Sequence, residues 1–151
     1  MKEKHIQAHM KSAFNYAECS TAKKLKVGCV LVKDDRIISI GYNGMPAGWS
    51  NDCETLSFFL HGKQLPSQVM ITKPEVLHAE ENAITKLAKS AESGEGATAF
   101  ITHAPCMSCA KLLHGSGIIE VFYANWYRDN SGLDFLEECG VKLTKTEGIK
   151  E

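Results

Sequence analysis

The sequence predicts an α/β protein, a three-layer α/β/α sandwich built around a mixed five-stranded sheet. Two β-rich segments flank Asp34-Asp35, which predicts an antiparallel hairpin. Both segments are apolar on both faces, as in a sheet covered by helices on each side. From Ala97 onwards, short apolar segments alternate with helical ones, and this alternation favours parallel pairing.

Hydrophobic spacing places the individual elements. Residues 3–19 predict an amphipathic helix, because apolar residues recur at steps of three and four: Ile6, Met10, Ala13, Phe14 and Ala17. A second helix is predicted over 78–91, closed by Gly94 and Gly96. The remaining predicted helices cover 107–115 and 131–139, and the predicted strands cover 27–32, 37–42, 97–102, 118–124 and 141–143.

Two segments give weaker signals. Residues 41–48 are rich in Gly, Asn and Pro, which by themselves predict a plain turn. Residues 49–76 show little periodicity, so we expect an irregular insertion with a short helix around 54–61.

Length and charge limit the function. The chain of 151 residues predicts one domain, 1–151, with a net charge of −1. That charge gives no basic field for nucleic acid, and Lys23 and Lys24 are interpreted as a solvated loop. The polar start, Met1–Met10, and the lack of a long apolar run predict no membrane association and a cytoplasmic, reducing location. The six cysteines are therefore expected to be thiols or metal ligands.

The chemistry is concentrated in two short motifs, His78-Ala79-Glu80 and Pro105-Cys106-Met107-Ser108-Cys109. Pro105 suits the entry of a helix, and the C-x-x-C spacing can place two thiolates on one metal ion. His78 is the natural third ligand, which leaves one position of a zinc ion open for water. Glu80 then stands outside the metal shell as general acid and base, the pattern of zinc-dependent base deamination.

Other interpretations of the C-x-x-C pair remain open at this point. A redox dithiol fits poorly, because such a site lies near the start of a βαβ unit and this one is late in the chain. A structural zinc site needs a fourth Cys or His nearby, for which His103 and His114 are the candidates. The His-x-Glu motif disfavours the structural site.

Three blocks resemble the cytidine deaminase superfamily, and within it the deoxycytidylate (dCMP) deaminases. They are Ile40–Gly48 (Ile-Gly-Tyr-Asn-Gly-Met-Pro-Ala-Gly), His78–Ile84 and Pro105–Lys111. The two zinc blocks are specific to the superfamily, whereas the Gly-Tyr-Asn-Gly-Met-Pro block points to the dCMP deaminases. The similarity extends over about residues 10–143.

The resemblance implies zinc-dependent hydrolysis of dCMP to dUMP and ammonia, which would supply thymidylate synthesis. By position it implies that His78, Cys106 and Cys109 hold Zn²⁺ and that Glu80 moves protons between water, ring N3 and the leaving amino group. It also implies substrate contacts: Val27 on the pyrimidine, Asn43 on the deoxyribose, the N–H of Ala79 on O2 and Tyr127 near the phosphate.

The resemblance further implies a homohexamer activated by dCTP and inhibited by dTTP, with Mg²⁺ accompanying the triphosphate. The implied effector site is Gly41, Tyr42, Asn43 and Gly44. Alternative functions are a deaminase of cytidine, deoxycytidine, dCTP or tRNA adenosine, and a non-catalytic zinc module. The charge of −1 disfavours tRNA, and Glu80 disfavours the module.

The chain also departs from the resembled pattern. Glu81 stands where the family usually has Leu or Met, and Ala104 where it often has Ser or Phe. Some relatives hold a second, structural zinc in the insertion. Cys19, Cys53 and His61 could offer ligands for it, although buried thiols are the favoured interpretation.

Overall fold

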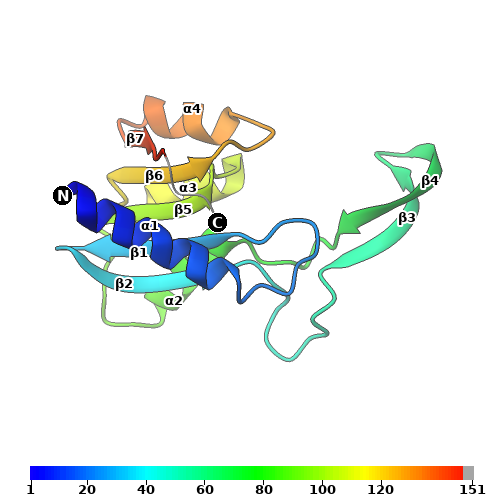
Figure 1. The fold of residues 1–151 in the computed structure, drawn as a ribbon, viewed down its shortest axis with the longest axis horizontal. Helices are drawn as coiled ribbons and strands as arrows, with labels where there is room; N and C mark the ends of the chain where they lie inside the picture. Colours follow the sequence, from blue (N-terminus) through cyan, green and yellow to red (C-terminus); the bar gives the residue numbers. More distant parts are fainter. Residues whose placement is uncertain (148–151) are drawn as a thin grey trace.

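The computed structural model describes residues 1–147 (Figure 1). Its elements, in order, are α1 (Glu3–Ala17), β1 (Gly28–Lys33), β2 (Arg36–Tyr42), β3 (Glu54–Leu60), β4 (Lys63–Thr72), α2 (Ala79–Ala88), β5 (Thr98–His103), α3 (Met107–Gly115), β6 (Glu120–Asn125), α4 (Ser131–Glu138) and β7 (Lys142–Lys145). Outside β3 and β4, every predicted helix and strand is present, with boundaries that differ by at most three residues.

The main sheet has five strands in the order β2-β1-β5-β6-β7. β1 pairs antiparallel with β2 and with β5, whereas β5, β6 and β7 run parallel. The β1–β2 hairpin turns at Asp34 and Asp35, both with positive φ, as a two-residue turn of type I′ requires. The predicted mixed five-stranded sheet is therefore confirmed.

The sheet separates two apolar layers. On one face, α1 contributes Met10 and Ala13 to a cluster with Val30, Val32 and Phe100. The larger layer on the other face joins α2, α3 and α4 to the alternate strand residues, among them Cys29, Leu31, Ala99, Ile101 and Val121. Because successive side chains of a strand point to opposite faces, β1 and β5 supply both layers, which explains their continuous apolar sequence.

The insertion differs from the prediction. Residues 54–72 form a two-stranded antiparallel sheet, not an irregular segment with a short helix. His61 and Gly62 lie between the strands with positive φ, as in a type I′ turn. Figure 1 shows this hairpin projecting away from the main sheet, and we call residues 54–72 the arm.

Two smaller expectations concern the cysteines and membranes. None of the six cysteines is in a disulfide, in line with their prediction as thiols or ligands. Within residues 1–147, no helix combines the length and the apolar character needed to cross a bilayer.

Candidate active site

The two predicted zinc motifs meet where two helices begin. His78 is the N-cap residue of α2, and Cys106 is the N-cap residue of α3, with Cys109 in the first turn of α3. Gly132, near the start of α4, packs directly on the Pro105-Cys106 turn. A Cβ at this position would lie 2.2 Å from the carbonyl oxygen of Pro105, so only glycine allows the approach.

The three side chains fit a zinc ion. The Nδ1 atom of His78 lies 3.6 Å from Sγ of Cys106 and 3.3 Å from Sγ of Cys109. Ligands at about 2.0–2.3 Å from a tetrahedral zinc are about 3.3–3.8 Å apart, so these separations suit one shared ion. In the described part of the chain, no other group of three His, Cys, Asp or Glu side chains converges in this way.

Hydrogen bonds among His78, Cys106 and Cys109 shift the pKa values of these three side chains. Hydrogen bonds from Cys109 and His78 lower the pKa of Cys106 to about 4. The hydrogen bond to Cys106 raises the pKa of His78 to about 8, and the hydrogen bond to Cys106, followed by burial, raises the pKa of Cys109. Because zinc ligands bind deprotonated, metal binding displaces the shared protons and is favoured as pH rises.

Glu80 lies beside this cluster and is only 4% exposed. Burial is the largest effect on its carboxyl and raises the pKa to about 7. A carboxyl group with such a pKa can both accept and donate a proton near neutral pH, as a general acid and base must.

A cavity of about 570 Å³ opens over the cluster. Its lining includes each residue predicted to contact substrate, namely Val27, Asn43, Ala79 and Tyr127, together with His78, Glu80 and Cys106. The volume lies within the range of small-molecule sites. Ala104, one of the departures, is buried and lines the cavity with its small side chain.

Asn43 is already engaged with the protein backbone. Its Oδ1 atom accepts a hydrogen bond from the N–H of Val27 at 2.8 Å, and its Nδ2 atom donates to the carbonyl of Leu25 at 2.8 Å. The side chain therefore shapes the cavity wall that carries Val27, whatever it contacts in a substrate.

The other residues of the predicted effector block do not line this cavity. Gly41 packs on α2, where a Cβ would lie 2.2 Å from the carbonyl oxygen of Ala79. Gly44 exchanges two backbone hydrogen bonds with Leu77, at 3.1 and 2.8 Å. Tyr42 lies under the ammonium group of Lys86, 5.6 Å from its ring centre. Close packing accounts for Gly41 without an effector, whereas a Cβ built at Gly44 would meet no atom within 4 Å.

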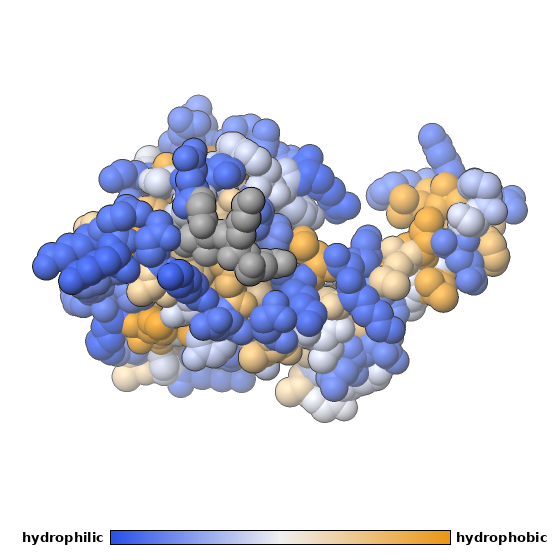
Figure 2. Space-filling model, in the orientation of Figure 1, coloured by the Kyte–Doolittle hydropathy of each residue, from blue (hydrophilic) through white to orange (hydrophobic). Residues whose placement is uncertain are grey.

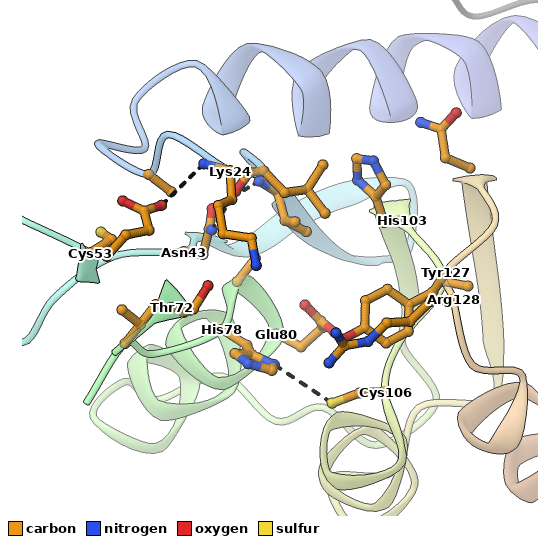
Figure 3. A pocket seen from close by; sticks show the side chains of 18 of the residues that line it. Lys24, Asn43, Cys53, Thr72, His78, Glu80, His103, Cys106, Tyr127 and Arg128 are labelled. Atoms are coloured by element: carbon orange, nitrogen blue, oxygen red, sulfur yellow. Dashed lines mark hydrogen bonds between the residues drawn. The ribbon is translucent and has the colours of Figure 1, made fainter. Parts of the chain in front are cut away.

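Sequence reasoning missed two cations of the cavity wall. Lys24, interpreted as solvated, and Arg128 both line the cavity. Figure 3 shows the Lys24 side chain pointing toward Glu80 from above and the Arg128 side chain reaching Glu80 from the side, with Tyr127 beside Arg128. The guanidinium carbon of Arg128 lies 5.4 Å from the ring centre of Tyr127. The signal for Arg128 was its place next to Tyr127, whereas Lys24 was indistinguishable from its exposed neighbour Lys23.

A second metal site is absent from the described residues. Cys19 is exposed, and Cys53 is buried beside Thr21, with Sγ 3.5 Å from Oγ1. His61 lies at the tip of the arm, and these three residues do not converge. The favoured interpretation as buried thiols agrees with the placement of Cys53 and is wrong for Cys19, which is exposed.

Fold and site together define a class, the α/β/α proteins with a His-Cys-Cys metal site and a buried glutamate at one cavity. Residues 3–125 match the family described as the cytidine and deoxycytidylate deaminase zinc-binding region. The chain belongs to this family, and the resemblance stated from its three blocks is confirmed.

Curated relatives and solved structures agree. The chain is 34% identical over 149 residues to a deoxycytidylate deaminase of Enterobacteria phage T4, covering 78% of this chain and 77% of that protein. It is 36% identical over 124 residues to the human deoxycytidylate deaminase, covering 80% of this chain and 65% of that protein. A crystal structure of dCMP deaminase from the cyanophage S-TIM5, in complex with dCMP and dUMP, matches with a TM-score of 0.84 and 39% identity, covering 97% and 99% of the two chains.

Proposed function

We propose that this protein hydrolyses dCMP to dUMP and ammonia and so supplies dUMP for thymidylate synthesis. The observation that carries the proposal is a buried carboxyl, Glu80, beside three converging metal ligands at a cavity of nucleotide size. Names of relatives that act on dCMP support the choice of substrate.

His78, Cys106 and Cys109 hold Zn²⁺ in this proposal. When bound, the ion supplies Lewis-acid activation of a water molecule. Glu80 takes a proton from the attacking water and delivers it to N3 of the ring, which makes C4 electrophilic. After water adds to C4, Glu80 carries a second proton to the amino group, which leaves as ammonia.

In this proposal, residues of the cavity wall bind the base, the deoxyribose and the phosphate of the nucleotide. Val27 packs on the pyrimidine, the N–H of Ala79 donates to O2, and Asn43 meets the deoxyribose. Lys24, Tyr127 and Arg128 provide two cations and a hydroxyl for the phosphate. Two cations on one wall suit a dianionic phosphate and disfavour an uncharged nucleoside.

Replacing Glu80 tests the mechanism. Glu80→Gln is expected to keep bound zinc, because this side chain lies outside the ligand set, and to lose nearly all turnover, because an amide cannot carry the proton. Zinc content and ammonia release are measured on the same preparation. Substantial turnover by the zinc-loaded variant would refute the role of Glu80.

A substrate panel tests specificity and regulation. Ammonia release is measured with dCMP, deoxycytidine, dCTP and cytidine, each with and without added dCTP or dTTP and Mg²⁺. We expect kcat/KM for dCMP to be far higher than for the other three compounds, and the rate with dCMP to be raised by dCTP and lowered by dTTP, in a homohexamer. A hyperbolic rate curve unaffected by either triphosphate would contradict regulation through Gly41, Tyr42, Asn43 and Gly44. Turnover confined to deoxycytidine or dCTP would contradict the phosphate assignment.

A further inference from the structure

The loop between α1 and β1 carries part of the cavity wall but contains no helix or strand. It covers residues 18–27, and Lys24, Leu25 and Val27 of this loop line the cavity. An irregular segment keeps a side chain in one place only if its backbone groups have partners elsewhere. The partners of this loop therefore decide where the ammonium group of Lys24 can lie.

Two side chains hold the loop at different points. Asn43 holds the end next to β1 through its two hydrogen bonds to the backbone. One carboxylate oxygen of Glu54, Oε1, accepts hydrogen bonds from the consecutive N–H groups of Lys23 at 2.8 Å and Lys24 at 3.1 Å. Among the described residues, neither N–H group donates to a backbone carbonyl. Glu54 is thus the anchor of the part of the loop that carries Lys24.

Glu54 is itself held in place, because it begins β3 at the base of the arm. Its partner in the strand register is Thr72, and both residues line the cavity. Beside them, the N–H of Lys73 donates to the carbonyl of Cys53 at 2.8 Å. Figure 2 shows the tip of the arm standing away from the rest of the molecule, so the arm reaches the cavity through its base. The carboxylate is therefore a fixed point for the loop.

The carboxylate of Glu54 binds the backbone of Lys24 and not its ammonium group. The ion pairs of the described residues do not include Glu54, and Figure 3 shows the Lys24 side chain pointing toward Glu80. The ammonium group thus stays available on the wall that it shares with Arg128. A cation on a fixed backbone loses less conformational entropy when it binds an anion, so this anchoring strengthens the contact.

We propose that Glu54 is a positioning residue for the phosphate of the substrate. By holding the backbone of Lys24, it directs the ammonium group to the phosphate. This role rests on the proposed function, because the ligand is a nucleoside monophosphate. Glu54 acts through Lys24 and takes no part in the reaction at the base.

A simple charge effect of Glu54 would have the opposite sign. A carboxylate near a phosphate site repels the ligand, so its removal should tighten binding of dCMP. Positioning predicts instead that removal of the side chain weakens binding, because Lys24 loses its anchor. Glu54→Gln separates the two effects, because the amide oxygen can still accept both hydrogen bonds whereas the charge is gone.

Single and double variants of the full, zinc-loaded chain test this role. They are Glu54→Ala, Glu54→Gln, Lys24→Ala and the double alanine variant, with Asp52→Ala as the matched control. Asp52 is an exposed carboxylate two residues before Glu54 and does not line the cavity. Steady-state kinetics are measured with dCMP and deoxycytidine, and binding of dUMP is measured by calorimetry. Zinc content and circular dichroism verify folding, and the hydrogen bond from Thr21 to the carbonyl of Asn51, at 2.9 Å, keeps the loop attached in every variant.

Glu54→Ala is expected to raise KM for dCMP and Kd for dUMP at least about five-fold, and by no more than Lys24→Ala does. Its kcat for dCMP and its kcat/KM for deoxycytidine are expected to stay unchanged, because Asn43 still holds the end of the loop that carries Val27. In the Lys24→Ala background, the same change is expected to have no further effect. Glu54→Gln is expected to keep most of the wild-type affinity, and Asp52→Ala all of it.

Other results with an active wild type overturn the positioning role alone. Tighter binding of dUMP by both Glu54 variants would show that the carboxylate acts as a repulsive charge. An unchanged KM in Glu54→Ala, an equal loss with deoxycytidine, or an equal effect of Asp52→Ala would show that no specific positioning occurs. Additive losses in the double variant would show that Glu54 acts independently of Lys24. A wild-type chain that neither turns over dCMP nor binds dUMP would overturn the proposed function, and the positioning role with it.

Discussion

At the scale of single residues, Lys24 contributes a cationic side chain to the wall of the cavity. Its backbone is fixed by Glu54, and its side chain is directed towards the space shared by Glu80 and Arg128. Lys23 is anchored by the same carboxylate but does not line the cavity. The two neighbours therefore form a natural pair for separating a phosphate contact from a general charge effect.

Lys24→Ala is expected to raise KM for dCMP by about 10–100-fold, since a hydrogen bond to a charged group contributes about 1.5–3 kcal/mol. The kcat/KM for deoxycytidine, which has no phosphate, is expected to stay unchanged. Steady-state kinetics of Lys24→Ala and the control Lys23→Ala measure the difference. An equal effect of both variants, or an equal effect on both substrates, would contradict a phosphate contact.

Glu81 explains a departure from the family pattern. Its Oε1 atom accepts a hydrogen bond from the backbone N–H of His78 at 3.0 Å. Glu81 is the third residue of α2, so its carboxylate satisfies a free donor at the helix start and favours the helix dipole. The carboxylate next to Glu80 thus fixes the turn that carries His78.

Glu81→Ala is expected to lower the free energy of unfolding by about 0.5–2 kcal/mol, the usual effect of losing a helix cap. Glu81→Gln, whose amide oxygen can still accept the bond, is expected to lose less. Urea unfolding of the zinc-loaded proteins measures both, with Glu137→Ala on the exposed surface of α4 as control. A loss in Glu137→Ala equal to that in Glu81→Ala would rule out a specific capping role.

Residue roles were predictable from sequence only where spacing is local. His78 with Glu80, and Cys106 with Cys109, are each fixed by helix geometry within one turn. The meeting of the two motifs at one site was predicted from the deaminase pattern, and the structure brings them together. The cations of the cavity wall come from separate loops, before β1 and after β6. Their convergence depends on the packing of the sheet, which no local pattern records.

At the scale of elements, α1 is tied to the β1–β2 turn by a small polar cluster. Asp35 accepts a hydrogen bond from Nε2 of His9 at 2.9 Å, and its second oxygen contacts Nδ1 of His5. The hydrogen bond to His9 lowers the pKa of the exposed Asp35 carboxyl. A carboxyl with a lowered pKa stabilises the fold above its unfolded pKa, about 3.9, and this contribution disappears as pH falls through the folded pKa.

Asp35→Asn is therefore expected to reduce the melting temperature at pH 6, and to match the wild type only once the pH falls below the lowered folded pKa of the Asp35 carboxyl. Asp34→Asn is the control, because Asp34 has the same positive φ in the same turn, whereas the contacts with His5 and His9 are made by Asp35. Thermal unfolding at both pH values measures the difference. A deficit in Asp35→Asn that persists at low pH would show that the turn, and not the charge, is responsible.

The helices and strands of the core were predicted because burial of one face makes apolar residues recur at regular spacing along the sequence. α1, α3 and the strands of the main sheet follow apolar spacings that a folded core requires. The arm has no core to impose a pattern, and Gln64, Pro66 and Gln68 interrupt its second strand. The alternation of Leu56, Phe58 and Leu60 before His61-Gly62 was the available sign of a hairpin.

At the scale of the whole molecule, the arm differs from the rest of the described protein, which we call the body, in where the apolar side chains lie. The body buries its apolar residues in two layers on either side of the main sheet. The arm leaves its apolar residues exposed and is anchored only at its base, where the N–H of Lys73 donates to the carbonyl of Cys53 at 2.8 Å. Folding and metal binding should then depend on the body and not on the arm.

Shortening the arm tests whether folding and metal binding depend on it. Leu56–Met70 is replaced by Asn-Gly, which joins the paired residues Thr55 and Ile71 through a two-residue turn. The shortened chain is expected to keep its zinc content and nearly all of its melting temperature, since no core cluster of the described residues loses a member. Loss of zinc or of cooperative unfolding would mean that the arm supports the body directly.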